Sequence, residues 1–325
     1  MARTRLYRNG VLEKENFPVA DISECVNDPG VVVWLDICVL DDETGLDDVE
    51  EEFGLHALAV EDAAHERQRP KLDHYGTHLF ISAYAIALNP QTMDLESSEL
   101  AMFVMPNALI TVRKDRKFDI DEVVKRWDAT PELVKEGAGF LLYGVLDYIV
   151  DGHFQAVQDL DERIEGLQDD LFDDSRDRVR EVQRKSFDLR RDLILLRRFV
   201  LPMREVVNGL MRRDVKVVND TLMPYFQDVY DHVLRATEWT ESLRDLVSTI
   251  LETNLTIQGN RMNLIMKQVT SWAAIIAVPT AVTGFYGQNL PYPGFQNNDG
   301  LLTSSLIIAL GSSALYFVFR RKGWL

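Results

Sequence analysis

The sequence contains few cysteines and no excess of basic residues, and both shortages exclude classes of protein. Among 325 residues only Cys25 and Cys38 carry thiols, so neither a cysteine-based zinc cluster nor a disulfide framework can form, and a reducing compartment is expected. The formal net charge is −17, from 52 acidic and 35 basic residues. Such a chain lacks the basic face that general nucleic-acid binding needs, but it can concentrate cations.

Signatures of secretion and of catalysis are also missing. The N-terminal segment MARTRLYRNGVLEKENF contains no apolar stretch, so no secretory signal is expected. No Gly-rich phosphate loop and no Ser–His–Asp set is present, so we predict no enzymatic activity. The six histidines include no HExxH motif. His74 and His78 lie four residues apart where a strand is predicted, and that spacing joins zinc ligands only on a helix.

Two segments near the C-terminus contain no charged residue. Residues 269–287 (VTSWAAIIAVPTAVTGFYG) and 301–319 (LLTSSLIIALGSSALYFVF) are 19 residues each. As helices they would be about 28 Å long, close to the thickness of a hydrocarbon core. Buried core helices are the alternative, but two such spans beside a short loop are unusual in a soluble domain. We therefore predict transmembrane helices over 269–288 and 301–320, joined by an extracellular loop over 289–300.

Charges around these two spans predict their orientation. Basic residues flank both outer ends, namely Arg261, Lys267, Arg320, Arg321 and Lys322, whereas the loop carries only Asp299. By the positive-inside rule, the outer ends face the cytoplasm. We expect a multi-pass protein of the cell membrane with both termini in the cytoplasm and a basic cytoplasmic tail over 321–325.

The first part of the chain mixes strand-like and helix-like patterns. Segments rich in β-branched and aromatic residues predict strands over 30–37, 79–86, 100–105 and 108–114. Residues 47–65 predict a helix. We expect residues 1–132 to form a cytoplasmic α/β domain with a mainly antiparallel or mixed sheet.

A long helical pattern follows over 133–268. An acidic amphipathic segment, 139–172, precedes a basic one, 176–213, which predicts an antiparallel hairpin with complementary faces; the acidic helix could also attract cations. A third helix is expected to begin near Asn219 or Asp220 and to run unbroken into the first span, over roughly 100 Å. A helix of that length must pack against others, and self-association around an axis is the simplest arrangement.

Three motifs occur in this order of elements: VEDAAHERQRPKLDHYGTHLFI (60–81), YFQDVYDH (225–232) and TGFYGQN (283–289). Together with the topology they resemble the CorA family of divalent cation transporters over nearly the whole chain. The resemblance implies a homopentameric funnel: an α/β cytoplasmic domain, a long helical stalk, five first spans lining a pore and five second spans around them. One departure is Gln288, where the family usually has Met; related zinc-associated members also vary this position.

The resemblance also implies roles for particular residues. Gly287, Gln288 and Asn289 would form the selectivity mouth, where Asn289 offers amide oxygens to a hydrated ion. Asp228 matches a carboxylate that binds a regulatory metal between neighbouring cytoplasmic domains, although its partner ligand cannot be identified. An ordinary helix cap and turn is the alternative for the mouth, and a helix-dipole aspartate is the alternative for Asp228.

The pore face can be projected by counting back from Asn289 in helical steps. This gives Gly284, Thr280, Ala277, Ala273, Thr270 or Val269, Met266 and Asn263. Thr280 could form a second ring of oxygens, Asn263 a polar ring at the cytoplasmic end, and Met266 with Val269 an apolar constriction that gates by dewetting. Ordinary helix packing is the alternative for each position.

These inferences predict a divalent cation channel for Mg²⁺ influx, with Co²⁺ or Ni²⁺ as further ions, gated by Mg²⁺ bound to the cytoplasmic domain. Its expected partners are copies of itself and the lipid bilayer. One alternative is a Zn²⁺ transporter with or without proton coupling. The absence of ionisable residues from both spans favours channel-like passage over coupling. Another alternative is a non-conducting, membrane-anchored sensor.

Overall fold

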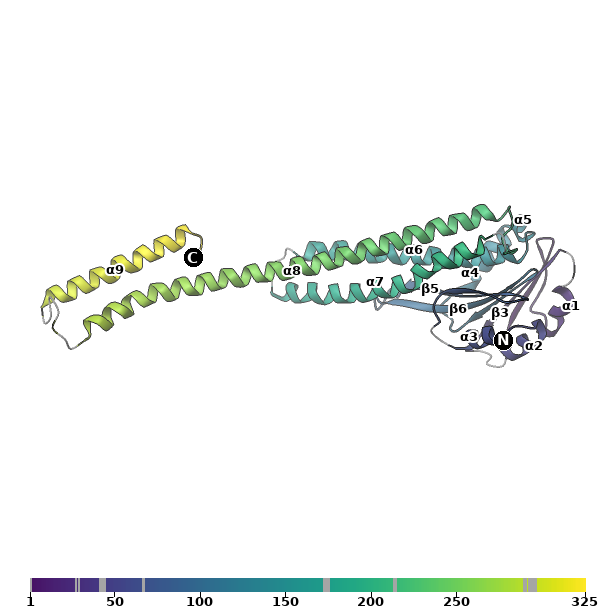
Figure 1. Cartoon of the computed structure of the whole chain (residues 1–325), viewed down its shortest axis with the longest axis horizontal. Coiled ribbons are helices and arrows are strands. Elements are labelled where there is room, and N and C mark those ends of the chain that lie inside the picture. The colour runs from purple at the N-terminus through teal and green to yellow at the C-terminus, as the bar shows by residue number, and fades with distance from the viewer. Residues whose placement is uncertain are drawn as a thin grey trace. The chain divides into compact units, whose positions relative to one another are not determined.

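The computed structural model describes residues 2–26, 28, 30–40, 45–65, 68–171, 176–212, 215–288, 291 and 297–325 (Figure 1). The chain divides into two compact units, Met1–Ile250 and Leu251–Leu325. Helix α8, Met223–Tyr286, contributes residues to both units.

The first unit contains a seven-stranded mixed sheet in the order β2-β1-β3-β7-β6-β5-β4. Strands β3 and β7 are parallel, and all other neighbours in this sheet are antiparallel. The predicted α/β fold is therefore confirmed. The strands are β1 (Arg3–Arg8), β2 (Val11–Glu15), β3 (Val31–Cys38), β4 (Lys71–His74), β5 (Leu79–Leu88), β6 (Leu95–Met105) and β7 (Ala108–Arg113).

Strand β3 is buried on both faces, and its alternating side chains divide the core in two. Val32 and Trp34 belong to one apolar cluster, and Val33 and Leu35 belong to the other. The second cluster lies under the helices α1 (Ile22–Val26), α2 (Gly45–Phe53) and α3 (Ala57–Ala64). The first lies under α4 (Ile120–Ala129), α5 (Pro131–Val134), α6 (Ala138–Leu171), α7 (Arg176–Leu210) and the start of α8. Layers of helices thus cover both faces of the sheet, and a short 3-10 helix (Val19–Asp21) precedes α1.

Several predicted boundaries were wrong. The helix expected over 47–65 is two helices, because Gly54 adopts a positive φ of 59° and the His56 imidazole accepts a hydrogen bond from the Leu58 N–H as a new N-cap. Strand β6 begins at Leu95, earlier than expected. Its pairing with β5 starts at Leu88–Leu95 and includes the polar segment 96–99, which the apolar pattern did not mark as strand. Strands β1 and β2 were not anticipated.

The predicted strand at residues 74–78 is mostly a turn. Strand β4 ends at His74, and the Tyr75 N–H donates to the His78 carbonyl (2.9 Å) to close a hairpin into β5. His74 and His78 are therefore four residues apart because they lie on either side of this hairpin turn.

Helices α6 and α7 form the predicted antiparallel hairpin. Opposite charges join them at two levels: Arg163 with Asp192 (3.1 Å) and Lys185 with Asp170 (3.0 Å). The acidic and basic segments are therefore partners in one pair of helices, and Figure 1 shows them side by side.

Helix α8 begins close to the expected position. The Asn219 side-chain oxygen accepts a hydrogen bond from the Leu222 N–H (2.9 Å), and Pro224 occupies the first turn, where its missing N–H has no helical acceptor. The helix then continues through residue 286, as the unbroken pattern predicted.

Candidate functional site

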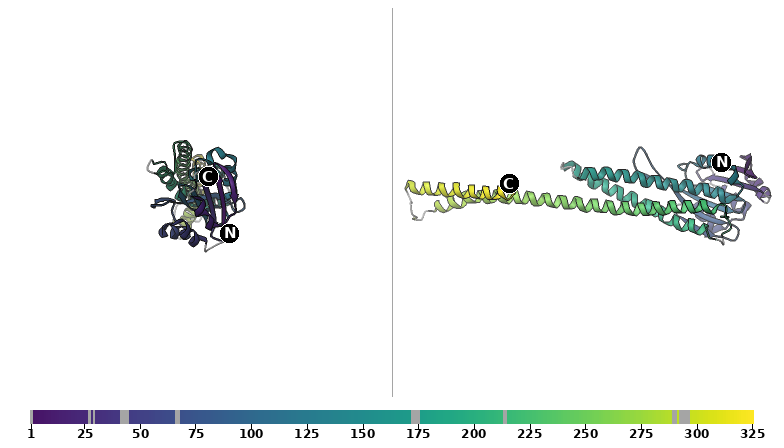
Figure 2. Two further views of the ribbon diagram at one scale, coloured as in Figure 1. Left: turned by 90° about the vertical axis from the view of Figure 1, so that its right-hand side faces the viewer. Right: turned by 90° about the horizontal axis from the view of Figure 1, so that it is seen from above.

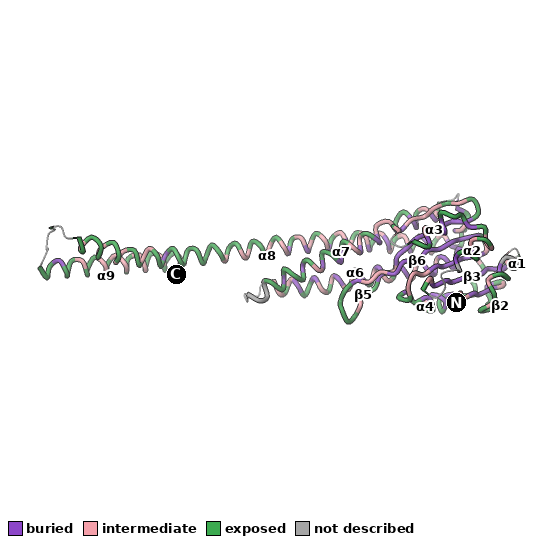
Figure 3. Tube along the Cα trace, turned by 90° about the horizontal axis from the view of Figure 1, so that it is seen from below, coloured by how far each residue is buried: buried purple, intermediate pink, exposed green. Residues whose placement is uncertain are grey.

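The described part of the chain contains two helices that are long and apolar enough to cross a membrane, α8 and α9 (Asn298–Arg321). Their apolar windows are 6% and 0% buried, so these side chains lie almost entirely on the surface of the single chain. Figure 3 shows this exposure along α9 and the last part of α8. Large apolar side chains on such a surface need lipid or other protein around them.

The last part of α8 and α9 pack against each other as antiparallel helices within the second unit (Figures 1 and 2). A Cβ added to Gly311 would lie 3.0 Å from Val278 Cγ1, so the small residue allows a close approach. Eight residues away on each helix, the Tyr286 hydroxyl lies 3.4 Å from Thr303 Oγ1. On the same side of α8 as Val278 and Tyr286, Ser271 is buried, and Ile275 and Val282 are half-buried.

The residues predicted to line a pore all lie on α8 and are all exposed in the single chain. They are Asn263, Met266, Thr270, Ala273, Ala277, Thr280 and Gly284. None of them belongs to the stripe that contacts α9. A face of α8 with small and uncharged polar side chains is therefore available to other helices or to water, and its role as a pore lining stays a prediction.

The predicted mouth residues follow directly after α8. The Gly287 N–H donates to the Thr283 carbonyl (2.8 Å), and the Gln288 N–H donates to the Phe285 carbonyl (3.2 Å). A Cβ at Gly287 would lie 2.9 Å from the Thr283 carbonyl oxygen, so this position requires glycine. Asn289 lies outside the described residues.

Two threonines of α8, Thr280 and Thr283, lie within four residues after Pro279, and their hydroxyls donate hydrogen bonds within the helix. The Thr280 hydroxyl donates to the Ile276 carbonyl (3.0 Å), and the Thr283 hydroxyl donates to the Pro279 carbonyl (2.8 Å). A hydroxyl that donates to its own helix keeps lone pairs that can accept from water. Thr280 can therefore present an acceptor oxygen without losing its internal hydrogen bond.

Asp228 lies on an exposed face near the start of α8, opposite α6. Burial raises the pKa of the Tyr143 phenol, and the nearby carboxylates of Asp147 and Asp228 raise it further. Burial also raises the pKa of Asp147, with a further contribution from Asp151. Asp228 and Asp147 thus both lie close enough to Tyr143 to affect its pKa.

Sequence reasoning missed Asp147, Asp151 and their partner on α4. Arg126 Nη1 lies 2.8 Å from Asp147 and 3.0 Å from Asp151, so one guanidinium neutralises both carboxylates. The four-residue spacing in DYIVD was the available signal, because it puts both carboxylates on one helix face. No three His, Cys, Asp or Glu residues in the described regions lie close enough to hold a metal. The described residues of one chain therefore do not fit a complete regulatory metal site.

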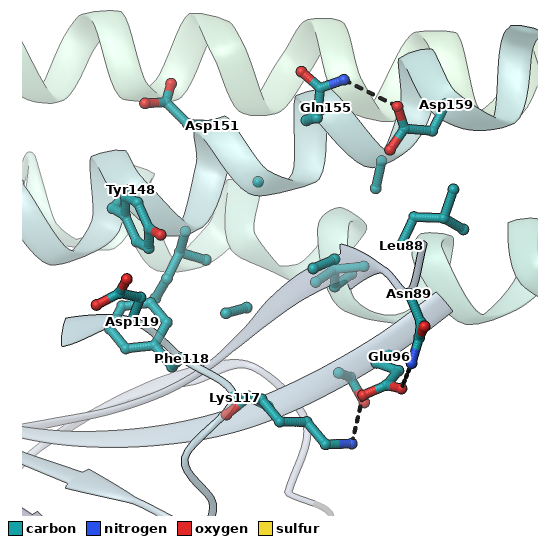
Figure 4. Close-up of a pocket in the computed structure, with 18 of the residues that line it drawn as sticks. Leu88, Asn89, Glu96, Lys117, Phe118, Asp119, Tyr148, Asp151, Gln155 and Asp159 are labelled. Carbon is teal, nitrogen blue, oxygen red and sulfur yellow. Dashed lines mark hydrogen bonds and ion pairs between the residues drawn. The ribbon is translucent and has the colours of Figure 1, made fainter. Parts of the chain in front are cut away.

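A groove of about 790 Å³ lies between α6 and the β5–β6 hairpin (Figure 4). Several polar side chains of the groove interact with one another. Glu96 forms an ion pair with Lys117 (2.8 Å), and the Gln155 amide donates a hydrogen bond to Asp159 (3.0 Å). Ser98, which also lines the groove, donates its hydroxyl to the Asp115 carboxylate (2.6 Å).

Comparison with known proteins agrees with these features. Residues 29–321 match the family described as CorA-like Mg2+ transporter protein. The cobalt/magnesium transport protein CorA of Thermotoga maritima is 27% identical over 96% of this chain and 90% of its own length. The YfjQ protein of Bacillus subtilis is 32% identical over 95% of this chain and 94% of its own length. The zinc transport protein ZntB of Yersinia enterocolitica is 22% identical over 81% of this chain and 79% of its own length.

A solved structure has the same fold. The CorA magnesium transporter of Methanocaldococcus jannaschii superposes with a TM-score of 0.79 and 22% sequence identity, covering 100% of this chain and 99% of that one. At this identity the likeness shows the fold alone, including the two C-terminal apolar helices.

Proposed function

Since the chain belongs to the CorA family of divalent cation transporters, we propose that it is a homopentameric channel that carries Mg²⁺ into the cell. Co²⁺ and Ni²⁺ are further ions for the same path. One observation carries the proposal: a face of α8 is exposed, uncharged and partly polar, and it leads to the Gly-Gln-Asn mouth. Five such faces around an axis would enclose a path lined by neutral oxygens.

Neutral oxygens suit an ion that keeps its water. Mg²⁺ loses its hydration shell reluctantly, so a ring of side-chain carbonyls can bind the shell without removing it. Asn289 would supply that ring, and Thr280 would supply a second one deeper in the membrane. Binding through water is weak enough to release the ion again, as conduction requires. Met266 would form the narrow apolar section, and Asn263 the polar cytoplasmic exit.

Asp228 is our candidate for a carboxylate that senses the cytoplasmic ion. Its exposure on α8 and its nearness to Tyr143 of α6, which Asp147 also affects, support this assignment. Because one chain does not supply a complete ligand set, we infer that a neighbouring copy would have to provide the remaining ligands.

Zn²⁺ transport is the second candidate, and two observations favour it. Gln288 replaces the usual Met of the mouth, and a relative described as a zinc transport protein aligns over most of the chain. Proton coupling has less support, since the apolar spans contain no Asp, Glu, His, Lys or Arg. A non-conducting sensor would not need the polar positions along the exposed α8 face.

Ion flux through the reconstituted protein tests the role of Asn289 at the mouth. The full chain is reconstituted into liposomes, and entry of Mg²⁺ and of Zn²⁺ is followed with ion-specific dyes. Asn289→Ala removes the proposed amide ring, so we expect Mg²⁺ flux to fall by roughly tenfold or more, because the mouth loses the carbonyl oxygens that accept hydrogen bonds from the hydration shell. Asn297→Ala, an amide in the same loop, is the matched control and should conduct normally.

Three outcomes are informative. Loss of Mg²⁺ flux in Asn289→Ala alone supports the proposal. Zn²⁺ flux without Mg²⁺ flux would replace it with the zinc alternative. If correctly inserted oligomers conduct neither ion, both transport hypotheses are excluded and the non-conducting sensor is the remaining alternative.

A further inference from the structure

Three cations follow one another at the end of α9. Arg320, Arg321 and Lys322 are exposed, and none forms an ion pair within the described regions. The second unit, Leu251–Leu325, contains only two acidic residues, Glu252 and Asp299. This is unexpected in a chain with 52 acidic residues against 35 basic ones. The helix dipole favours cations at a C-terminus, but it supplies only about half a charge.

The chain after α9 folds back and places an aromatic ring among these cations. Gly323 adopts a positive φ of 67°, and the Trp324 N–H then donates to the Phe319 carbonyl (2.9 Å). The Trp324 ring stacks on Phe319 with centroids 5.5 Å apart and planes 10° apart. Lys322 Nζ lies 5.4 Å from the centre of the Trp324 ring. The tail is thus an ordered turn with a defined arrangement of charge and indole.

The contact between α8 and α9 shows which residues of α8 lie at the same level as this turn. Gly311 lies beside Val278, and eleven residues further along each helix are Lys322 and Lys267. Lys267 is also exposed and therefore adds a fourth cation at the same level. From Tyr286 to Lys267 the helix rises about 28 Å, which is the thickness of one hydrocarbon core. The cations and Trp324 therefore lie at the membrane surface opposite the mouth.

We propose that Arg320, Arg321, Lys322 and Lys267 bind the phosphate of anionic phospholipid headgroups, with Trp324 anchored in the headgroup layer beside them. The inference rests on the proposed membrane spans, but not on ion conduction. Anionic headgroups attract basic residues next to a membrane span, and an indole ring is favoured at that depth because it is both apolar and a hydrogen-bond donor. The lipid thus supplies negative charge to a unit that contains only two acidic residues.

The test uses the full-length chain in vesicles of phosphatidylcholine alone and in a roughly four-to-one mixture with phosphatidylglycerol, a lipid with one negative charge. After mild detergent extraction, native mass spectrometry counts the phosphatidylglycerol molecules that remain bound. The variant Arg320→Gln/Arg321→Gln/Lys322→Gln removes three charges of the turn. We expect its apparent affinity for phosphatidylglycerol to fall by roughly tenfold to a hundredfold, as estimated from the attraction of each basic side chain to an anionic surface.

A matched control changes the same number of charges elsewhere. Arg190→Gln/Arg204→Gln/Arg235→Gln neutralises three exposed arginines of the first unit and should retain phosphatidylglycerol as the unmodified chain does. Equal retention by the tail variant and the control would overturn the proposal. If the true counter-ions are carboxylates of the first unit, the unmodified chain will show no preference for phosphatidylglycerol, and the tail variant will lose thermal stability equally in both lipids.

Ion flux is not part of this measurement. Lipid binding can therefore be confirmed in a chain that fails to conduct, and it can fail in one that conducts Mg²⁺. The two proposals stay separable.

Discussion

His153 on α6 is a neutral donor held entirely inside the protein. Its side chain is fully buried, and its Nε2 lies 2.7 Å from the Tyr84 carbonyl of β5, to which it donates. Burial lowers the pKa of His153 from 6.5 to about 4, while the hydrogen bond to the Tyr84 carbonyl acts in the opposite direction. Nothing in the amino-acid pattern separates this histidine from an exposed one, because its position is decided by how α6 packs on the sheet.

The lowered pKa predicts a pH-dependent stability. Between pH 6.5 and about 4 the unfolded chain binds a proton at His153 and the folded chain does not, so acid favours unfolding. The contribution is complete above pH 6.5 and is lost as the pH falls toward 4. Compared with His153→Gln, which cannot be protonated, the chain should lose about 2 kcal/mol of unfolding free energy between roughly pH 7 and pH 5.

The measurement is denaturant unfolding of the detergent-solubilised full chain, followed by the fluorescence of the buried Trp34 and Trp127. His74→Gln, at the exposed end of β4, serves as the control and should leave the pH dependence unchanged. A pH dependence that is the same with and without His153 would contradict the prediction.

Among the elements, the parallel pair of β3 and β7 contains a buried polar network. Asp36 on β3 is 3% exposed and forms a bidentate pair with Arg113 on β7, with its closest contact at 2.5 Å. The Thr111 hydroxyl donates to Asp36 (2.7 Å), and the Trp34 indole N–H donates to Thr111 (3.1 Å). The register that sets Asp36 opposite Thr111 makes this network possible.

Breaking this pair should be costly. Asp36→Ala leaves the half-buried guanidinium of Arg113 without its partner, and we expect it to lower the unfolding free energy by about 3–5 kcal/mol. The double variant Asp36→Leu/Arg113→Leu removes both charges and should recover much of that loss. Thermal unfolding of the detergent-solubilised chain measures both. Glu13→Ala, which breaks an exposed pair with Arg8, is the control and should have a small effect. Equal destabilisation by the single and double variants would show that the charge pairing is not the cause.

The whole molecule combines an acidic, well-packed first unit with a second unit whose apolar side chains are exposed. Burial in the first unit extends through both faces of the sheet and into the helices. In the second unit, Asn254, Ser271 and Gly300 are the buried residues among those described. A helix face with exposed Ala273 and Ala277 allows close approach of neighbouring copies in a bilayer, where small residues favour helix contacts.

Self-association through that face predicts the mass of the assembly. Native mass spectrometry of the detergent-solubilised protein should show five copies of the 37.2 kDa chain. Ala277→Phe fills the small face and should lower the fraction of pentamer several-fold, since bulky side chains keep helix backbones apart. Ile276→Phe, the adjacent residue on another face, should associate normally. A monomer, or a pentamer equally stable in both variants, would exclude association through this face.

The sequence by itself determined the features that depend on residues close together along the chain. The lack of charge in two spans, the complementary charges of 139–172 and 176–213, and the unbroken helix into the first span are local patterns, and the structure contains the corresponding helices. The CorA resemblance likewise rests on short motifs, and the family match confirms it.

Only the tertiary structure decided the features that need residues far apart in sequence. The order of the strands, the joining of Arg126 to Asp147 and Asp151, and the burial of His153 all depend on which surfaces meet. The alignment of Lys267 with the turn after α9 depends on the register of two antiparallel helices. Local patterns carry no information on such registers, because hydrophobic burial is non-directional and a contact across the fold is set by the packing of complete elements.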